Sequence, residues 1–412
     1  MKLYALDVYL RGVKAGRMEG RAAARMRFTY DTEFPARPGA IPLSISLPFG
    51  PESFDEARTR PFFAGLLPEG VVREALARRL GLSQTNELGL LEAIGGECAG
   101  AVAVVPAGDD APAHGGYEAL DEERLHDLVG RLPSRPLLAG EGALRLSLAG
   151  AQHKLPVFLD NETVSLPKGD APSTHILKVP IRDVPETVEN EAFCMALARE
   201  CGLLVPDAFA RRVRGKSVYF VRRYDRAVGS SGRIERLHQE DLCQALGIPP
   251  ELKYEQEGGP SLASCVELLR GHSVQPAIDV RALIAWTAFN HLIGNADAHG
   301  KNIALLLLGS GPRLAPFYDL LCTEIYPGLT ERHAMAIGGE KRPEWRMDRH
   351  WKRLADELLV GSALVRRLVS EMAKRVRAAA PALAKRHDAG IVGKVVELAV
   401  RRAEQTLERL GV

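Results

Sequence analysis

The chain has 412 residues, more than one hydrophobic core usually holds, so we expect two or three domains or lobes. Its 54 lysines and arginines nearly balance 52 aspartates and glutamates, which excludes a histone-like polycation but not a local basic patch. Six scattered cysteines form no Cys-x-x-Cys pair, and no uncharged segment is long enough to cross a bilayer. We therefore expect a cytoplasmic protein without a membrane partner.

Before residue 143 the sequence predicts a small β-rich region with a few helices. Apolar and polar residues alternate over 3–10, 26–30 and 41–47, which is typical of an antiparallel sheet. The later predicted elements are helices over 68–80, 88–94 and 121–132 and a buried strand over 101–105. Proline and glycine are concentrated at 107–116 and 133–142, so a domain boundary is expected between 107 and 142.

Beyond this boundary, short strands give way to helices. Strands are predicted over 144–147, 155–159, 163–166 and 175–179, then a helix over 187–201 and a hairpin of 208–214 and 217–224. From residue 233 the pattern is helical, with a helix over 282–292 and one strand pair at 303–308 and 313–315. We thus predict four parts: an N-terminal subdomain 1–110, a linker with a short helix 111–142, a small lobe 143–230 and a helical large lobe 231–412. The fold class is α+β, with the bilobal layout of a protein kinase.

The segment 295–302 carries the strongest chemical signal. Asp297 lies five residues before Asn302, and Asp319 follows Asn302 by seventeen residues. In a kinase catalytic loop, Asp-x-x-x-x-Asn places an acid that orients the acceptor hydroxyl and an amide that binds Mg²⁺. A polar turn or a helix N-cap explains each residue singly. The joint spacing favours phosphoryl transfer from ATP, with Asp319 as the other metal ligand.

Two further segments offer groups that could bind phosphate. In 147–154, Gly150 and its small neighbours would let backbone N–H groups approach phosphate oxygens, although an ordinary hairpin turn is the better explanation of this segment taken alone. Lys178 lies in an apolar strand and needs a polar partner, for which Glu191 and Glu189 are both candidates.

Histidines near Asp297 also permit a metal-site interpretation. His291 and His299 could bind zinc with Asp297, but His299 is only two residues from Asp297, a spacing that suits a loop better than a tetrahedral site. We favour a hydrogen bond from His299 that orients Asp297.

Several segments in the right order resemble the HipA family of bacterial toxin serine/threonine kinases, nearly from end to end. They are 62–69, 96–102, 147–154, 174–178, 190–191, 223–226, 238–241, 295–302 and 316–319. His153 and Ala296 depart from the family's usual residues, and neither belongs to the metal-binding set.

The resemblance implies roles for individual residues. Asp297 would be the catalytic base, Asn302 and Asp319 would hold Mg²⁺, and Ser147 would be autophosphorylated, ejecting its loop. The residues implied to contact ATP are Ser147, Ala149, Gly150, Ala151, Gln152, Lys154, Lys178, Arg223, Tyr224, His299 and Lys301.

The resemblance also implies partners. These are a helix-turn-helix, HipB-like antitoxin, operator DNA through the antitoxin complex, and an aminoacyl-tRNA synthetase as protein substrate. One alternative is a catalytically weak corepressor within an antitoxin–DNA complex, and another is a kinase for a small molecule or lipid.

Overall fold

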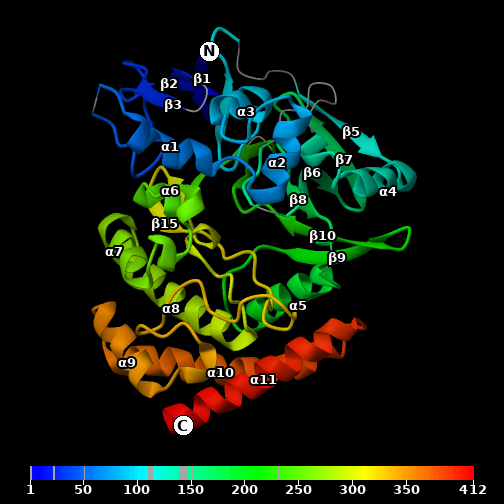
Figure 1. The fold of residues 1–412 in the computed structure, drawn as a ribbon, viewed down its shortest axis with the longest axis vertical. Helices are drawn as coiled ribbons and strands as arrows, with labels where there is room; N and C mark the ends of the chain where they lie inside the picture. The colour runs from blue at the N-terminus through cyan, green and yellow to red at the C-terminus, as the bar shows by residue number, and fades with distance from the viewer. Residues whose placement is uncertain are drawn as a thin grey trace. The chain divides into compact units, whose positions relative to one another are not determined.

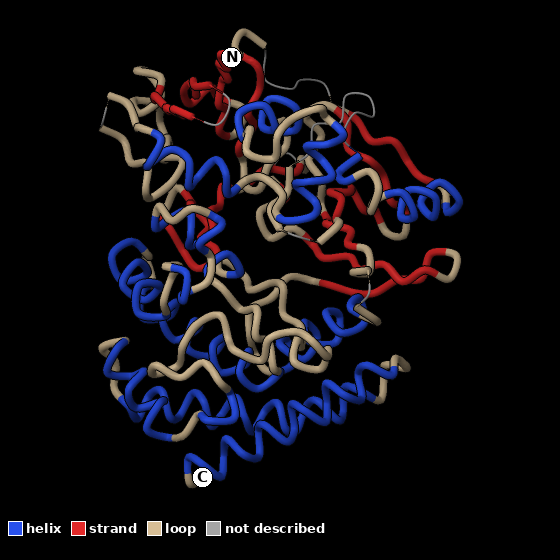
Figure 2. The backbone as a smooth tube through the Cα atoms, in the orientation of Figure 1, coloured by secondary structure: helices blue, strands red, loops and turns tan. Residues whose placement is uncertain are grey.

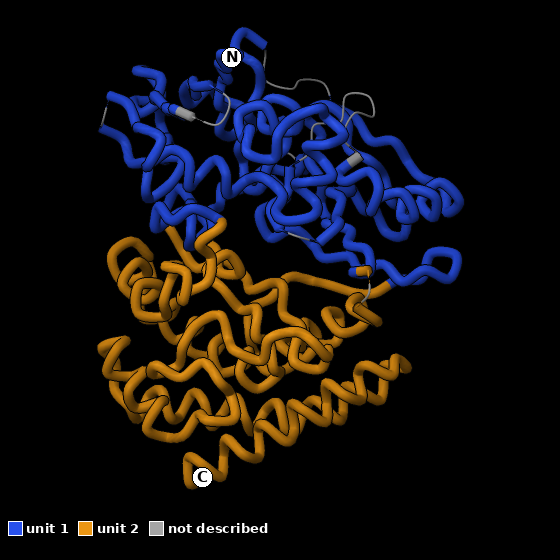
Figure 3. The backbone as a smooth tube through the Cα atoms, in the orientation of Figure 1, with its two compact units in different colours: residues 1–181, 211–250, 305–310 blue, residues 182–210, 251–304, 311–412 orange. Residues whose placement is uncertain are grey.

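The computed structural model describes residues 2–21, 24–50, 52–109, 115–138, 147–150, 152–182, 184–229 and 232–412. The chain forms two compact units (Figure 3). Unit 1 comprises residues 1–181, 211–250 and 305–310, and unit 2 comprises residues 182–210, 251–304 and 311–412. The four-part division expected from the sequence stays a prediction.

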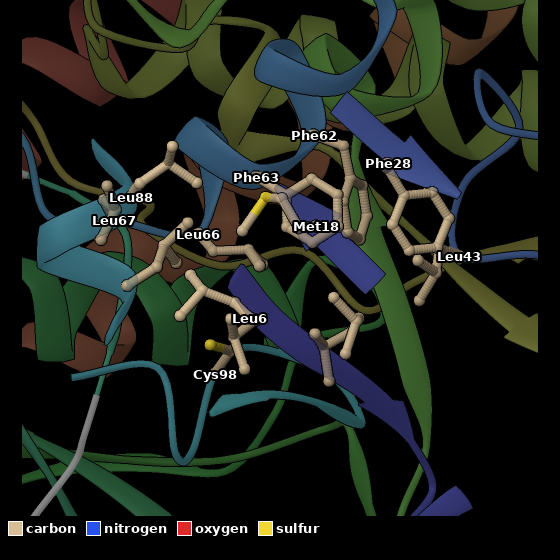
Figure 4. Packing of buried hydrophobic residues seen from close by; sticks show 14 of the residues in the cluster. Leu6, Met18, Phe28, Leu43, Phe62, Phe63, Leu66, Leu67, Leu88 and Cys98 are labelled. Carbon is tan, nitrogen blue, oxygen red and sulfur yellow. The ribbon is translucent and has the colours of Figure 1, made fainter. Parts of the chain in front are cut away.

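Unit 1 begins with a four-stranded antiparallel sheet in the order β3-β2-β1-β4 (Figure 1). Its strands are β1 (Leu3–Leu10), β2 (Val13–Arg21), β3 (Ala24–Tyr30) and β4 (Val102–Pro106). Three helices follow β3 in the chain: α1 (Glu56–Gly65), α2 (Gly70–Arg79) and α3 (Glu87–Ile94). Leu6, Met18 and Phe28 of the sheet pack with Phe63 and Leu88 in one buried cluster (Figure 4). This core fixes the loops that leave the helices toward residues 66–69 and 96–100.

A second sheet of unit 1 has six strands in the order β5-β7-β6-β8-β10-β9. They are β5 (Gly116–Leu120), β6 (Lys154–Asp160), β7 (Thr163–Lys168), β8 (His175–Lys178), β9 (Ala208–Val213) and β10 (Lys216–Arg222). Helix α4 (Glu122–Arg131) contributes Leu125 and Leu128 to a cluster with Leu155 and Leu177 of this sheet. Asp121 caps α4 by accepting from the Arg124 N–H.

The remaining elements of unit 1 are short. They are a 3₁₀ turn η1 (Pro136–Leu138), strands β11 (Arg226–Val228), β12 (Ile234–Arg236) and β13 (His238–Asp241), helix α6 (Leu242–Leu246), and most of β14 (Ala304–Leu308).

Unit 2 consists mainly of helices and loops (Figure 2). Its helices are α5 (Thr187–Glu200), α7 (Leu262–His272), α8 (Pro276–Ile293), α9 (Asp348–Glu357), α10 (Ser362–Ala384) and α11 (Gly390–Leu410). Its short elements are β15 (Gly311–Leu314) and the 3₁₀ turns η3 (Glu255–Glu257), η4 (Gly300–Asn302) and η5 (Pro343–Trp345). Nowhere in the described ranges is a helix both long and apolar enough to span a membrane.

The central helix of unit 2, α8, has clear sequence signals at both ends. Pro276 occupies its first turn, where a missing N–H costs nothing. Gly294 ends it in the left-handed region, at φ 71°, which a residue with a Cβ adopts only with strain. The chain therefore leaves α8 sharply and enters 295–302 as a loop.

Most predicted elements are present, but two expectations about secondary structure were wrong. Residues 41–47 form no strand of the sheet. Leu43 and Leu47 are buried in the core from a loop, and the Tyr30 hydroxyl accepts from the Leu43 N–H and donates to the Leu47 carbonyl. In the first sheet, the strand that was not predicted is β2 (Val13–Arg21). Strands β12 and β13 also interrupt the region after 233 that was expected to be helical apart from one strand pair. The expected strand over 144–147 falls mostly outside the described residues, and Ser147 itself lies in a loop.

Candidate active site

The loop after α8 is held at its start by buried amides. The Asn295 N–H donates to the Asn290 carbonyl at 3.0 Å, and Asn295 Nδ2 donates to Asn290 Oδ1 at 2.8 Å. On the other side, the Thr323 N–H donates to the Gly294 carbonyl, and Thr323 Oγ1 accepts from the Ala296 N–H at 2.8 Å. Both asparagines and Thr323 are buried. The backbone that precedes Asp297 is therefore fixed.

Asp297, the predicted base, is exposed. Its backbone N–H donates to Asn295 Oδ1 at 3.2 Å. Its carboxylate Oδ1 accepts a 2.7 Å hydrogen bond from the hydroxyl of Tyr254. Tyr254 was not predicted from the sequence, because the two residues are 43 positions apart and no spacing rule connects them.

The structure brings Asn302 and Asp319 together, as the spacing predicts. Asn302 Nδ2 donates to Asp319 Oδ2 at 3.3 Å, and Asn302 Oδ1 accepts from the His299 N–H at 3.0 Å. The Tyr318 hydroxyl donates to the Lys301 carbonyl at 2.7 Å and ties the two segments together. Asp319 has φ 54°, a left-handed conformation that Asp tolerates better than most residues but that still costs energy.

The donor set at Asn302 and Asp319 suits Mg²⁺ better than zinc. Mg²⁺ is commonly held by one or two protein oxygens together with substrate phosphates, whereas zinc needs several nitrogen or sulfur ligands. Within the described ranges, no three His, Cys, Asp or Glu side chains are grouped to hold a metal. His291 is occupied elsewhere: its Nδ1 lies 2.9 Å from Arg346 Nη1 and its Nε2 lies 3.3 Å from Thr406 Oγ1. The alternative zinc site is therefore not formed.

A buried ionic group supports the segment after Asp319. Arg402 on α11 donates to both oxygens of Glu324, at 2.8 and 2.7 Å, and the Glu324 N–H donates to the Gly294 carbonyl. Burial raises the pKa of Glu324, but hydrogen bonds from His333 and Arg402 outweigh it and lower that pKa to about 2. Burial and Arg346 lower the pKa of His333 to about 3, so this histidine is neutral at pH 7 and donates through Nε2.

In unit 1, the segment 147–150 is attached to the region between α1 and β4. The Ser147 N–H donates to the Glu97 carbonyl at 2.8 Å, and its hydroxyl donates to the Leu66 carbonyl at 2.7 Å. The Glu69 N–H donates to the Gly150 carbonyl at 3.1 Å. Ser147 is fully buried. The predicted phosphate loop is thus held in place mainly through backbone groups.

Gly150 allows a lysine to lie against this loop. It has φ +112°, and a Cβ built there would be 2.5 Å from Lys154 Nζ. Further along, Gln152 Nε2 donates to the Val179 carbonyl at 2.9 Å. Ala149 is half-buried beside Gly150, and Ala151, also predicted to contact nucleotide, lies outside the described residues.

Lys154 and Lys178 are direct cross-strand partners in the β6–β8 register. Such a pair has its side chains on one face of the sheet, about 5 Å apart at Cβ, where like charges repel. Lys178 is buried, and its Nζ lies 5.4 Å from the ring centroid of Tyr219 on β10. This concentration of positive charge on one face fits a polyphosphate ligand.

Arg223, which was predicted to contact the nucleotide, is buried beside two carboxylates. Its guanidinium is 1% exposed and donates to both oxygens of Asp225, at 2.9 and 2.7 Å, and to Glu97 at 3.3 Å. Arg226 donates to the same Glu97 oxygen at 2.9 Å. Burial raises the pKa of Glu97, but the two arginines outweigh it and lower the pKa overall. Arg223 therefore anchors a buried ion cluster, defined here as Glu97, Arg223, Asp225 and Arg226.

The neighbouring predicted nucleotide contacts are placed as follows. The Tyr224 hydroxyl donates to Gln239 Oε1 at 2.5 Å, and the residue is half-buried. His299 and Lys301, on either side of Gly300 in the loop 295–302, are both buried.

Two family patterns cover most of the chain. The HipA-like C-terminal domain matches residues 146–381, and the HipA N-terminal domain matches residues 6–105. The chain belongs to the HipA family.

Individual relatives agree with this HipA assignment. The chain is 43% identical over 379 residues to the putative kinase Y4mE of Sinorhizobium fredii, covering 90% of each protein. It is 30% identical over 356 residues to the serine/threonine-protein kinase toxin HipA of Shewanella oneidensis, covering 83% of this chain and 80% of that protein. A solved complex of S. oneidensis HipA, HipB and operator DNA contains a chain that matches with a TM-score of 0.86 and 27% identity over 98% of both chains.

This HipA-family chain is a serine/threonine-protein kinase of the toxin–antitoxin class, and ATP is the phosphate donor that such a kinase requires. The predicted α+β kinase-like fold is confirmed. Sequence analysis missed Tyr254 and the buried role of Glu97. Glu97 lies in a segment that contributed to the family resemblance, but nothing in the sequence connects it with Arg223, 126 residues away.

Proposed function

We propose that this chain transfers the γ-phosphoryl group of ATP to a serine or threonine hydroxyl, with Asp297 as base and with Asn302 and Asp319 as Mg²⁺ ligands. The observation that carries the proposal is the meeting of Asn302 and Asp319 at 3.3 Å, while Asp297 on the same loop keeps an exposed carboxylate. Bound Mg²⁺ would neutralise phosphate charge and align the phosphates.

The protein groups divide the remaining work. As the acceptor oxygen bonds to the γ-phosphorus and the bond from that phosphorus to the leaving oxygen of ADP breaks, the hydroxyl proton passes to Asp297. Lys154, Lys178 and the backbone N–H groups of 149–152 bind phosphate oxygens. Tyr224, His299 and Lys301 are further nucleotide contacts in this proposal.

Intact mass after incubation with ATP and MgCl₂ tests the chemistry. We expect phosphate addition in the wild type and a loss of about 100-fold or more in Asp297→Asn, since a general base contributes about 10²–10⁴-fold. Binding of ADP with Mg²⁺, followed by thermal shift, is the control for folding. A variant that keeps the wild-type rate would overturn Asp297 as base.

We also propose Ser147 as the autophosphorylated residue. Its hydroxyl donates to the Leu66 carbonyl in a site without solvent exposure. A phosphate carries nearly two negative charges and cannot donate to that carbonyl, so a modified loop would have to leave this position. Peptide mapping of the modified chain distinguishes Ser147 from other serines.

The proposed partners follow from the relatives. The S. oneidensis HipA structure contains HipB and operator DNA. We propose a helix-turn-helix, HipB-like antitoxin for this chain and, through it, an operator complex in the cytoplasm, so that corepression and kinase activity coexist. Aminoacyl-tRNA synthetases are the proposed protein substrates, on family resemblance. Incubation of a purified synthetase panel with labelled ATP and the kinase tests that proposal, and an unlabelled panel would overturn it.

A further inference from the structure

We propose that Tyr254 is a positioning residue for the base: its hydroxyl fixes Asp297 through Oδ1 so that Oδ2 meets the acceptor hydroxyl. The proposal rests on Asp297 acting as base. The hydroxyl donates to Asp297 Oδ1 at 2.7 Å, a hydrogen bond to a charged group. Asp297 is exposed, and an exposed carboxylate would otherwise sample several rotamers.

Tyr254 is itself held from several sides. Its ring meets the His299 ring edge-on, with centroids 5.4 Å apart and planes at 82°. Its carbonyl accepts from the N–H groups of Glu257 and Gly259, both at 2.9 Å, in a turn around η3. Gly259 packs so closely that a Cβ there would lie 2.2 Å from the Leu252 carbonyl oxygen. The phenol is therefore presented from a tight turn and not from a free loop.

The same turn is connected back to the catalytic loop by a second route. Glu255, next to Tyr254, accepts from the Ala336 N–H at 2.6 Å. Two residues earlier, the Ala334 N–H donates to the carbonyl of Ala296 at 2.8 Å. The residue before Asp297 and the residue after Tyr254 are thus both attached to the segment 334–336. This closed arrangement fixes the relative placement of hydroxyl and carboxylate.

Proton transfer depends steeply on placement, since a misplacement of the order of 1 Å can cost about 100-fold. We expect Tyr254→Phe, which removes only the hydroxyl, to lower the rate of phosphate transfer at saturating ATP by roughly 10- to 100-fold. The KM for ATP should stay within about twofold, because the change does not touch the phosphate-binding groups. Tyr326→Phe is the matched control: its hydroxyl pairs with Asn190 at 3.0 Å in the same unit, and the variant should keep the wild-type rate.

The deciding experiment is a double-mutant cycle with Tyr254→Phe and Asp297→Asn, using whichever acceptor the wild type labels, the chain itself or the synthetase panel. If Tyr254 acts through Asp297, adding Tyr254→Phe to Asp297→Asn causes no further loss. The positioning role would be overturned if the rate losses of the two single variants multiply in the double variant. It would also be overturned if Tyr254→Phe keeps or exceeds the wild-type rate. Each of these results would leave Asp297 as base. Full activity in Asp297→Asn would instead overturn the proposed base, and this inference with it.

Discussion

The predicted phosphate loop of unit 1, residues 147–150, and the predicted catalytic loop of unit 2, residues 295–302, are held in different ways. The predicted catalytic loop is held from inside its own unit: the Asn295 and Thr323 side chains accept from its backbone N–H groups, and Asn290 holds Asn295. The phosphate loop is attached to a distant part of the chain, through the carbonyls of Leu66 and Glu97. Those two residues lie 81 and 50 positions before Ser147.

The difference indicates how each loop can move. The catalytic loop leaves its position only if buried amides lose their partners, which costs about 1–3 kcal/mol for each group. If the predicted phosphate loop detaches, as we propose for the phosphorylated chain, it has to break only a few hydrogen bonds, and β6 and β8 can stay paired. The N-terminal region, which a minimal kinase would not need, thus holds the segment that we propose binds phosphate.

The largest expected loss of stability comes from a change in the buried ion cluster, at Glu97. Removing one partner from a buried ion pair leaves an uncompensated charge and typically costs about 3–5 kcal/mol. We expect Glu97→Gln to lower the free energy of unfolding by about 3 kcal/mol, because Arg223 and Arg226 lose a shared carboxylate. The backbone carbonyl of Glu97 also accepts from the Ser147 N–H. If the backbone at residue 97 shifts when the side chain loses its charge, the predicted phosphate loop shifts with it, and the KM for ATP should rise.

Urea unfolding and initial rates over a range of ATP concentrations check both parts of this prediction. Glu118→Gln is the control, since Glu118 pairs with Lys168 and Arg124 at the surface and should change the unfolding free energy by less than about 1 kcal/mol. Equal losses in the two variants would contradict the special role of the cluster.

A second expectation concerns acid sensitivity in unit 2. Burial lowers the pKa of His291 well below its ordinary value, and burial with Arg346 lowers that of His333 to about 3. Below pH 6.5 the unfolded chain therefore binds more protons at these positions than the folded chain, so stability falls as pH falls. At pH 5 the loss from His333 is roughly 2 kcal/mol, from about 1.4 kcal/mol for each pH unit below 6.5. His291 changes the stability in the same direction.

Urea unfolding between pH 7 and pH 5 measures this loss, and His333→Gln isolates one histidine. The variant cannot take up a proton at that position, so its stability should fall with pH less steeply than that of the wild type. Identical slopes in the two proteins would show that His333 does not titrate on unfolding.

Local features of the two loops could be predicted from the sequence, and contacts between distant segments could not. The pair of Asp297 and Asn302 was predictable because both lie on one short loop, and α8 was predictable from its apolar pattern. The strand expected over 41–47 was wrong because Leu43 and Leu47 are buried in a loop that Tyr30 holds. Tyr254 and Glu97 act through contacts between distant segments, and local spacing carries no information about them. How each loop is held in place could therefore be seen only in the structure.

The smallest expected effect on stability is that of Ser147→Ala. This variant tests separately how Ser147 holds the predicted phosphate loop and whether its hydroxyl accepts phosphate. Ser147→Ala removes the hydrogen bond to the Leu66 carbonyl but keeps the N–H bond to Glu97. We expect a loss of about 1 kcal/mol in the free energy of unfolding, the usual contribution of one neutral hydrogen bond. ATP should still bind, since the backbone attachment remains, while self-modification disappears and labelling of other proteins lasts longer. Intact mass and a time course of labelling measure these outcomes. Phosphate addition that persists in Ser147→Ala would place the modification on another residue and would remove the reason to expect the loop to leave its site.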